Sequence, residues 1–437
     1  MADILIATYP LAGHTLPLRP TARELASRGH RVRWYAGAAF ARTVRATGAE
    51  HIPMRPTIDR DGRPLDEVHP DRARLTGLDK LRWDMKHLFI EPAIEQVAHL
   101  RRILGDDPAD VIVVDPGFTG ARMLSELDGL PWVSVGITPL MLPSRHLPPF
   151  GPGLLPNGSL AGRLRDRVLR AMTSRKLRDV VAYRDEVRAR LGLPASGDDL
   201  MTGFLSPHLH LQASVPGLEY PRSDLPATVH FIGALHGPIT SQPGQADAGW
   251  AEMDIEPDGR PLVHVTQGTL ANDDLGRLLR PTIEALAGED VRVLATLGSR
   301  RATHPDLDSL PSNAVVVPYA SYDWLLPRTR VMVTNGGYGG VTQALAHGVP
   351  LVVAGAGEDK PEVAARVAWS GAGINLKTDR PTPARIRAAV REVLDTPSYA
   401  TRARALEDEF ARYDAPALVA DSIENLLTEQ AGQRPAA

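Results

Sequence analysis

The chain of 437 residues has no cysteine, which excludes disulfide bonds, cysteine-ligated metals and thiol chemistry. No stretch approaches the ~18–20 consecutive apolar residues of a membrane-spanning helix. Neither sign of charge is in large excess: the net charge of −3 gives the chain as a whole no electrostatic reason to bind nucleic acid or an anionic membrane. The first residues enter an expected strand, Ile4–Ala7, without a basic n-region, so we expect no signal peptide and a cytoplasmic protein.

Short apolar, β-branched stretches alternate with segments of helical spacing along both halves of the chain. This alternation predicts parallel sheets covered by helices on both faces. The chain is long enough for two or three domains. We expect an N-terminal domain at 1–235, a linker rich in Pro, Gly, Ser and Gln at 236–259, and a C-terminal domain at 260–414. A basic insertion with helical spacing is expected at Leu160–Arg190.

The segment 331–360 carries the clearest functional signal. Val331–Thr334 is typical of a buried strand, Asn335-Gly336-Gly337 predicts a tight turn, and a helix is expected from Tyr338. Such a turn leaves backbone N–H groups at a helix N-terminus, which bind phosphate without a metal. A lone glycine turn is more often only a tight connection. Here Glu358-Asp359-Lys360 follow the next strand, at the edge where parallel sheets bind ligands.

This segment resembles the donor-binding motif of the UDP-glycosyltransferase superfamily, and the resemblance extends over essentially the whole chain. The family pattern is His-x-Gly-x-(Asn/Gly)-(Ser/Gly)-x-x-(Glu/Gln), then Gly-(Val/Ile)-Pro, then an Asp/Glu-Gln pair, and residues 335–360 keep its spacing. The resemblance implies the α/β GT-B fold, in which two doubly wound Rossmann-like domains face each other across a cleft. It also implies that a C-terminal helix, at about 415–430, crosses back to the N-terminal domain.

Two positions depart from the family pattern. Asn335 stands where the family usually has a phosphate-contacting His, and Lys360 stands where it usually has Gln. Asparagine can donate to a phosphate oxygen but carries no charge. Lys360 either offers donors to sugar oxygens beside Asp359 or turns outward as a solvated residue, and the sequence favours neither alternative.

His14 and Asp115 are the catalytic candidates. His14 follows the first strand and Asp115 follows the strand Val111–Val114. In a doubly wound sheet of order 3-2-1-4-5, strands one and four are neighbours, so their carboxyl ends bring the two residues together. Histidine takes a proton near neutral pH, and a carboxylate fixes its tautomer. The resemblance assigns the base to His14 and its partner to Asp115. A solvated or capping His14 and a turn-forming Asp115 are the structural alternatives.

The family motifs place further donor-binding residues on this chain. The resemblance implies Thr269 as a phosphate contact, with Thr266 as the fallback, and Tyr319 as the ring that stacks on the base. The remaining donor-binding candidates are Tyr322, Asn335, Gly336, Gly337, Gly339, Gly340, Gln343, Asp359 and Lys360. A Tyr ring can stack on uracil or on thymine, so the nucleobase stays open. Gln343 could equally be an exposed helix residue.

The resemblance implies inverting, metal-independent transfer of a sugar from a UDP- or dTDP-linked donor to a hydroxyl of a lipophilic small molecule. No cofactor beyond this co-substrate is expected, and no Asp-x-Asp pair stands near the phosphate site. The expected state is a monomer or homodimer. The apolar acceptor-binding candidates are Met85, Phe89, Phe118, Leu140 and Met141. The alternatives are a catalytically silent nucleotide-sugar-binding protein that activates a partner, and a GT-B sugar-nucleotide epimerase.

Overall fold

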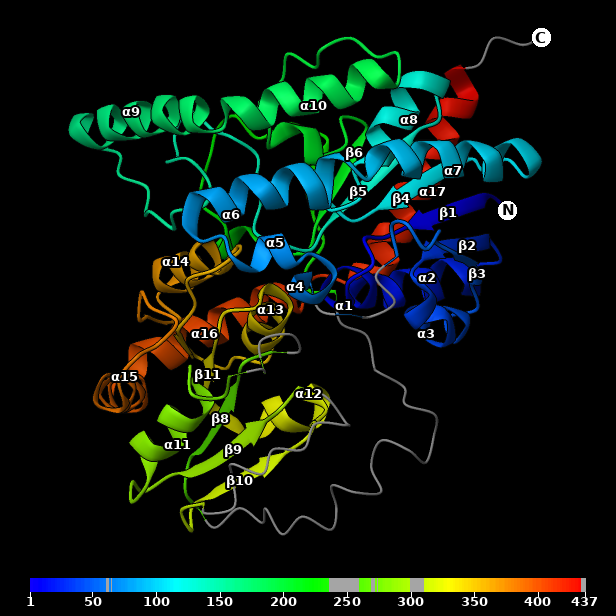
Figure 1. Cartoon of the computed structure of the whole chain (residues 1–437). Helices are drawn as coiled ribbons and strands as arrows, with labels where there is room; N and C mark the ends of the chain where they lie inside the picture. Colours follow the sequence, from blue (N-terminus) through cyan, green and yellow to red (C-terminus); the bar gives the residue numbers. More distant parts are fainter. Residues whose placement is uncertain are drawn as a thin grey trace.

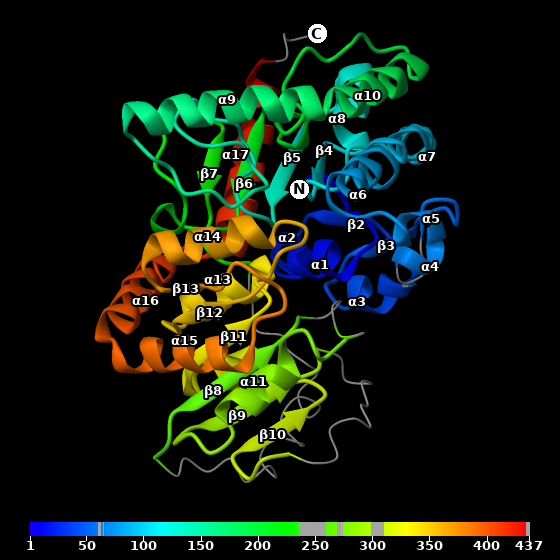
Figure 2. The same ribbon diagram turned by 60° about the vertical axis from the view of Figure 1, so that its left-hand side comes forward.

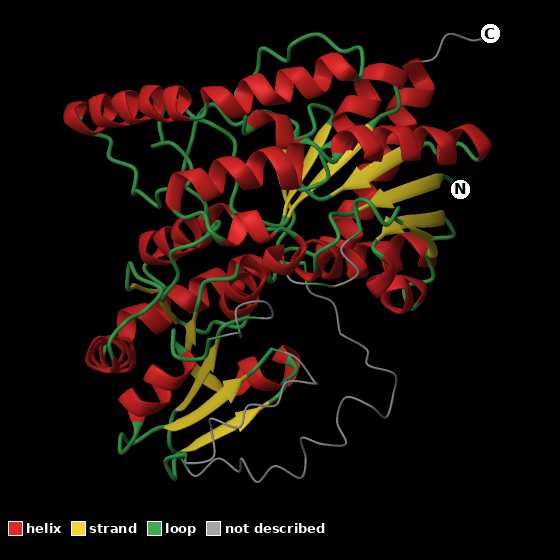
Figure 3. Cartoon of the chain, viewed as in Figure 1, coloured by secondary structure: helices red, strands yellow, loops and turns green. Residues whose placement is uncertain are grey.

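The computed structural model describes residues 1–59, 63, 65–235, 259–268, 272, 274–298 and 310–433. These residues form two α/β halves, each built on a parallel sheet with helices on both faces (Figures 1 and 3). The first sheet lies in the upper part of Figure 1 and the second in the lower part. Apart from Gly259, the expected linker at 236–259 lies outside the described residues.

The first sheet has seven parallel strands in the order β3-β2-β1-β4-β5-β6-β7. Its strands are β1 (Asp3–Ala7), β2 (Arg31–Ala36), β3 (Glu50–Pro53), β4 (Val111–Val114), β5 (Trp132–Gly136), β6 (Leu209–Gln212) and β7 (Val229–Phe231). Ala7 of β1 lies opposite Val114 of β4, so the two strands end at the same edge of the sheet. The expected order 3-2-1-4-5 is present, but the sequence analysis missed β6 and β7.

The helices of this half include the two that make up the basic insertion. They are α1 (Ala12–Thr15), α2 (Arg19–Ser27), α3 (Ala41–Arg45), α4 (Leu65–Val68), α5 (Pro70–Ala73), α6 (Gly77–Asp84), α7 (Ala93–Asp106), α8 (Gly120–Asp128), α9 (Leu160–Lys176) and α10 (Arg178–Arg190). A π-helical turn, Met85–Ile90, connects α6 to the segment before α7. The break before α7 falls at Pro92, which has no N–H to continue the helix.

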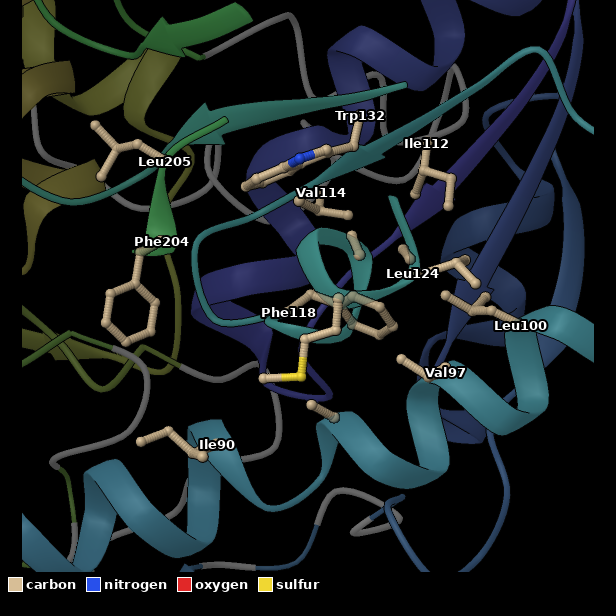
Figure 4. Close-up of a cluster of buried hydrophobic side chains, with 14 of the residues drawn as sticks. Ile90, Val97, Leu100, Ile112, Val114, Phe118, Leu124, Trp132, Phe204 and Leu205 are labelled. Atoms are coloured by element: carbon tan, nitrogen blue, oxygen red, sulfur yellow. The ribbon is translucent and has the colours of Figure 1, made fainter. Parts of the chain in front are cut away.

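Alternate side chains of each strand enter two separate core layers of the first half. Leu5 and Ile112 face the layer under α7, α8 and α10, where Figure 4 shows Ile112 and Leu100 in one apolar cluster. Ile4 and Val113 point to the opposite face, which α2, α3 and the last helix of the chain cover. A sheet buried on both faces explains why its strands are nearly continuous apolar runs.

The second sheet has six parallel strands in the order β10-β9-β8-β11-β12-β13. Its strands are β8 (Leu262–Thr266), β9 (Arg292–Thr296), β10 (Ala314–Val317), β11 (Thr329–Thr334), β12 (Leu351–Val353) and β13 (Gly373–Asn375). The helices after β8 are α11 (Leu279–Leu286), α12 (Tyr322–Leu325), α13 (Tyr338–Ala346), α14 (Lys360–Ser370), α15 (Pro383–Asp395), α16 (Pro397–Phe410) and α17 (Ala415–Gln433). Helices α11 and α15 cover one face, and α13, α14 and α16 cover the other.

The last helix, α17, crosses back to the first half, as Figure 2 shows. Val419 and Ile423 of α17 are fully buried in the core layer that contains Leu25 of α2. At the surface, Arg28 donates to Asp421 over 2.5 Å. The crossing helix expected from the sequence is therefore present, and it fastens the end of the chain to the first sheet.

A buried charged cluster joins the two halves at a second place. Arg366 of α14 donates to Glu219 over 2.7 Å and to Glu362 over 2.9 Å. All three side chains are at most 5% exposed. The other carboxylate oxygen of Glu362 accepts from the N–H groups of Gly151 and Gly153, at 2.8 and 2.9 Å. The cluster thus ties the segment after β5 to the helix that follows β12.

Replacing Arg366 by Met should destabilise the protein by about 3–5 kcal/mol, because Glu219 and Glu362 would keep buried charges without their partner. Arg101→Met is the matched control. It removes a surface pair with Asp128, whose side chains are 47% and 35% exposed, and should cost about 1 kcal/mol or less. Denaturant unfolding of both variants measures the difference. Equal losses of stability would show that the buried cluster does not hold the halves together.

Candidate active site

His14 and Asp115 lie side by side at the carboxyl edge of the first sheet. His14 sits in the short helix α1 after β1, and Asp115 comes directly after β4. Nδ1 of His14 is 2.5 Å from Oδ2 of Asp115. Because a carboxylate accepts at Nδ1, that nitrogen carries the proton and Nε2 is left to accept one. The His14 side chain is 19% exposed and Asp115 is fully buried.

Asp115 is held by three hydrogen bonds. Its Oδ1 accepts from the N–H of Tyr9 over 2.7 Å, and its Oδ2 accepts from the N–H of Gly117 over 2.7 Å as well as from His14. The bond to Gly117 is the turn-forming interaction that the sequence left open as an alternative. The turn that the sequence allowed for Asp115 is therefore present, and it also orients the carboxylate toward His14.

The ring of His14 is packed from one side by aromatic residues. The Tyr9 ring meets it edge-on at 5.3 Å between centroids, and Phe89 lies 5.3 Å from Tyr9 in turn. Gly117 is required on the other side, because a Cβ there would lie 2.9 Å from Asp115 Oδ2 and from the His14 ring. The imidazole is thus fixed in one orientation.

The glycine turn between β11 and α13 forms the corresponding edge of the second sheet. Gly336 has φ of +84°, a conformation that favours glycine, and Gly337 is the N-cap of α13. A Cβ on Gly355 would lie 2.1 Å from the Asn335 carbonyl, so that glycine lets the next loop approach the turn. The N–H groups of the first α13 turn, at Tyr338, Gly339 and Gly340, have no acceptor within the helix by its geometry.

Asn335 connects two loops of this edge. Its Nδ2 donates to the carbonyl of Gln267 after β8 over 2.5 Å, and its Oδ1 accepts from the N–H of Gly337 over 3.4 Å. One amide hydrogen is thereby committed to the fold, and the second has no acceptor among the residues that the structure describes. The side chain holds the β8 loop against the glycine turn, a role that the sequence gave no reason to expect.

The other described donor-site candidates lie at or after the ends of β8, β10 and β11. Thr269 lies outside the described residues, and Thr266 is 2% exposed, with its hydroxyl accepting from the N–H of Gly268. Tyr322 packs edge-on against His264 at 5.8 Å, and burial raises the pKa of its phenol. Tyr319 is half-buried, and Gln343 donates to the carbonyl of Gly339 over 3.0 Å.

Asp359 and Lys360 begin α14 beside the glycine turn. Burial raises the pKa of the Asp359 carboxyl to about 6, while Lys360 lowers it and Glu358 raises it. A protonated His14, from the other half of the molecule, would also lower this pKa, so the candidate base and Asp359 lie within electrostatic range of each other. Lys360 is 16% exposed and forms an ion pair with Glu358, so it neither points freely into solvent nor pairs with Asp359.

The comparisons with known proteins agree on one family. Residues 280–426 match the model of the Erythromycin biosynthesis protein CIII-like C-terminal domain. The chain is 47% identical to 4'-demethylrebeccamycin synthase of Lentzea aerocolonigenes, over 98% of this chain and all of that one. It is 34% identical to UDP-glycosyltransferase 2 of Phaeomoniella chlamydospora, over 97% and 95% of the two chains.

The chain belongs to the UDP-glycosyltransferase superfamily. Its fold is that of the spinosyn rhamnosyltransferase SpnG complexed with thymidine diphosphate, with a TM-score of 0.68 over 97% of this chain and all of that one at 20% identity. The two facing α/β halves are therefore the GT-B fold that the sequence predicted. Within the described ranges, this glycosyltransferase has no helix long and apolar enough to cross a membrane.

The acceptor-binding candidates of the glycosyltransferase divide into two groups. Phe118, Leu140 and Met85 are 1%, 2% and 7% exposed and belong to the core layer under α7 and α8. Their side chains stabilise this core layer and leave almost no surface for an acceptor. The expectation that these three residues bind the acceptor is therefore contradicted by their burial. Phe89 and Met141 are only partly buried and keep surface for a ligand. An apolar residue near a strand end gives no sequence signal for which way it points.

The sequence reasoning also missed residues that shape the site of the glycosyltransferase. Gln212 at the end of β6 donates to the hydroxyl of Tyr338, the first residue of α13, over 3.1 Å. Its Oε1 lies 3.1 Å from the buried His210. Polar residues in a strand give no clear signal, because their partners come from distant segments. Among the side chains that the structure describes, no group of three or more His, Asp or Glu is arranged to hold a metal ion.

Replacing Gly117 by Ala should lower kcat by about 10²-fold, because the new methyl group must displace His14 or Asp115. Gly13→Ala is the matched control, since a Cβ on Gly13 has no neighbour within 4 Å. Steady-state kinetics and nucleotide titration of both variants check this, with nucleotide affinity expected to be unchanged. Full turnover in Gly117→Ala would mean that the orientation of the pair does not matter.

The raised pKa of the Asp359 carboxyl predicts that the stability of the fold depends on pH. Its pKa of about 6 in the fold lies above its value of about 3.9 in an unfolded chain. The stability that this group contributes is therefore present below about pH 4 and is lost as the pH rises through about 6. Asp359→Asn should then raise Tm relative to the parent at about pH 8, and by less at about pH 5.

The control for this comparison is Asp71→Asn, since the Asp71 side chain is 87% exposed. Its difference in Tm from the parent should be the same at both pH values. A gain in Asp359→Asn that did not shrink toward low pH would contradict the raised pKa.

Proposed function

We propose that the protein transfers a sugar from a nucleoside diphosphate sugar to a hydroxyl of a lipophilic small molecule, with inversion at the anomeric carbon and without a metal. The observation that carries the proposal is the position of His14. Its ring is oriented by Asp115 at the carboxyl edge of the first sheet, and it lies within electrostatic range of Asp359, whose neighbour Lys360 packs beside the glycine turn before α13. A candidate base from one half and a candidate phosphate-binding helix end from the other are thus both near Asp359.

His14 activates the acceptor in this account. The pKa of an alcohol or phenol hydroxyl lies well above 7, so near neutral pH the oxygen attacks carbon efficiently only when a base takes its proton. Nε2 of His14 takes that proton as the oxygen attacks, and the buried Asp115 stabilises the imidazolium that forms. A base of this kind contributes about 10²–10⁴-fold in rate. One displacement, with the nucleophile opposite the leaving group, inverts the configuration of the sugar.

The leaving diphosphate is stabilised by the N-terminus of α13. The N–H groups of its first turn and the positive end of the helix dipole favour the negative charge that develops on the β-phosphate oxygen. The second amide hydrogen of Asn335 is available to the same oxygens. These groups fill the place that a divalent cation takes in metal-dependent transferases.

The Asp359 carboxylate is positioned for the sugar. It lies at the N-terminus of α14 near the charge of His14, and it can accept hydrogen bonds from sugar hydroxyls. Thymidine diphosphate is bound in the spinosyn rhamnosyltransferase, whereas the fungal relative is named for UDP, so we propose a pyrimidine nucleotide that stacks on Tyr319.

The proposed acceptor is lipophilic because the surface beside His14 is aromatic and apolar. The partly buried Phe89 and Met141 offer apolar contact area rather than charge, and Phe89 packs on the buried Tyr9 ring beside His14. We place the enzyme in the cytoplasm as a monomer or homodimer. The silent nucleotide-binding protein and the sugar-nucleotide epimerase are less well supported, because neither needs a histidine and carboxylate pair opposite the sugar site.

The purified protein, with excess EDTA, should convert a nucleoside diphosphate sugar and a phenolic acceptor to a glycoside. An α-linked donor should give a β-glycoside, and NMR coupling constants of the anomeric proton report this. Activity that EDTA abolishes and magnesium or manganese restores would contradict metal independence. Retained configuration would exclude a single displacement. Binding of nucleotide without any turnover across UDP- and dTDP-linked donors would favour the silent binding protein.

A further inference from the structure

Helix α9 exposes its apolar face. Leu160, Leu164, Val168 and Met172 are 83%, 62%, 49% and 49% exposed. They follow one another at intervals of four residues, so they form one stripe that covers about a third of the helix circumference. In Figures 1 and 2 this helix runs along the outer edge of the first half, on the side away from β8, β9 and β10. No other described helix has four large apolar side chains this exposed.

The opposite face of α9, which contacts the protein, is mostly small or polar, with the half-buried Leu169 as its large apolar residue. The buried residues of the helix are Gly162 and Asp166. Arg170 donates to the carbonyl of Leu147 over 2.5 Å, and Arg165 donates to the carbonyl of Leu155 over 3.0 Å. A helix that folds onto a globular core turns its apolar stripe inward. In α9 the arrangement is reversed, so the stripe is built for a partner other than this fold.

Basic residues border the apolar stripe of α9. The helix carries six basic residues and one acidic residue, and the acidic one, Asp166, is buried. By helical geometry Arg163 and Arg167 lie along one side of the stripe and Lys176 lies along the other, while Arg165 is paired with the buried Asp166. The net charge of the whole chain, −3, does not reveal this local excess of positive charge on α9. An apolar stripe flanked by basic residues is the pattern of a helix that lies in a membrane interface.

We propose that α9 binds the surface of an anionic lipid bilayer, with its apolar stripe between the acyl chains and its basic residues at the headgroups. A second copy of the chain fits this face less well. Packing α9 against α9 would bring the basic residues beside each stripe against their counterparts, which repel. The stripe also supplies only four of the roughly 20–30 residues that each partner contributes to a standard interface.

Membrane binding would have a consequence for the acceptor site. Arg170 holds Leu147, which lies in the segment that connects β5 to α9 and includes Met141. An enzyme resting on α9 would present this segment to the layer in which lipophilic molecules concentrate. This consequence rests on the proposed acceptor class, whereas lipid binding by α9 does not.

Flotation of the full-length protein with lipid vesicles tests the proposal. The protein should bind vesicles of phosphatidylcholine mixed with phosphatidylglycerol and bind pure phosphatidylcholine at least tenfold more weakly. Binding should also weaken at about 1 M salt, where the Debye length is about 3 Å. The double variant Leu164→Glu/Val168→Glu should lose anionic-vesicle binding by tenfold or more. The control Leu310→Glu, at an exposed leucine of the second half, should bind like the parent.

A second variant, Arg163→Glu/Arg167→Glu, leaves the apolar stripe intact and should also bind at least tenfold more weakly, since each basic residue near the surface adds to the attraction. Unchanged Tm and unchanged turnover of a water-soluble acceptor would show that both variants fold. No binding by the parent, or equal binding by the stripe variant, would overturn the proposal. Conversion of a dimer to a monomer by Leu164→Glu/Val168→Glu in sedimentation velocity would assign the stripe to a second copy instead.

Discussion

The active site depends on one buried carboxylate. Asp115 is fully buried, and its two oxygens accept from two backbone N–H groups and from His14. An ionised carboxylate without such partners would be too costly to bury. The same bonds that make the burial possible fix where the oxygen points, and therefore which nitrogen of His14 carries the proton. Tyr9 and Gly117 are positioned in turn by the ends of β1 and β4, so the sheet itself sets the orientation of the base.

The second requirement is that the two halves face each other. The proposed base belongs to the first sheet and the proposed phosphate-binding helix to the second, so in this account neither half holds a complete site. Among the described residues, the connections that fix their arrangement include α17 on α2, the buried cluster around Arg366, and the bond between Gln212 and Tyr338. The last two meet α14 and α13 near their N-terminal ends, where the proposed donor-binding residues lie. Contacts that stabilise the interface therefore also position these residues.

The sequence predicted the parts of the molecule that follow from local rules. Apolar runs indicated most strands. The neighbouring positions of the first and fourth strands in a doubly wound sheet predicted that His14 and Asp115 lie close together. The omitted strand β6 contains His210 and Gln212, whose burial depends on Ser134 and Tyr338, far away in the chain. The side chains of Phe118 and Leu140 enter the core because of the turn of each loop, which residue type does not specify. Asn335 and Lys360 likewise gained their partners, Gln267 and Glu358, only from the geometry of the loops.

The central claim is that His14 removes the proton of the acceptor. A series of phenols of decreasing pKa tests it most directly, because a more acidic phenol needs less help from a base. We expect the parent enzyme to depend weakly on phenol pKa and His14→Ala to depend on it steeply. The loss of about 10²–10⁴-fold should appear with the least acidic phenols and nearly vanish for phenols already ionised at the assay pH. A loss of the same size across the whole series, with unchanged nucleotide affinity, would contradict the role of His14 as the base.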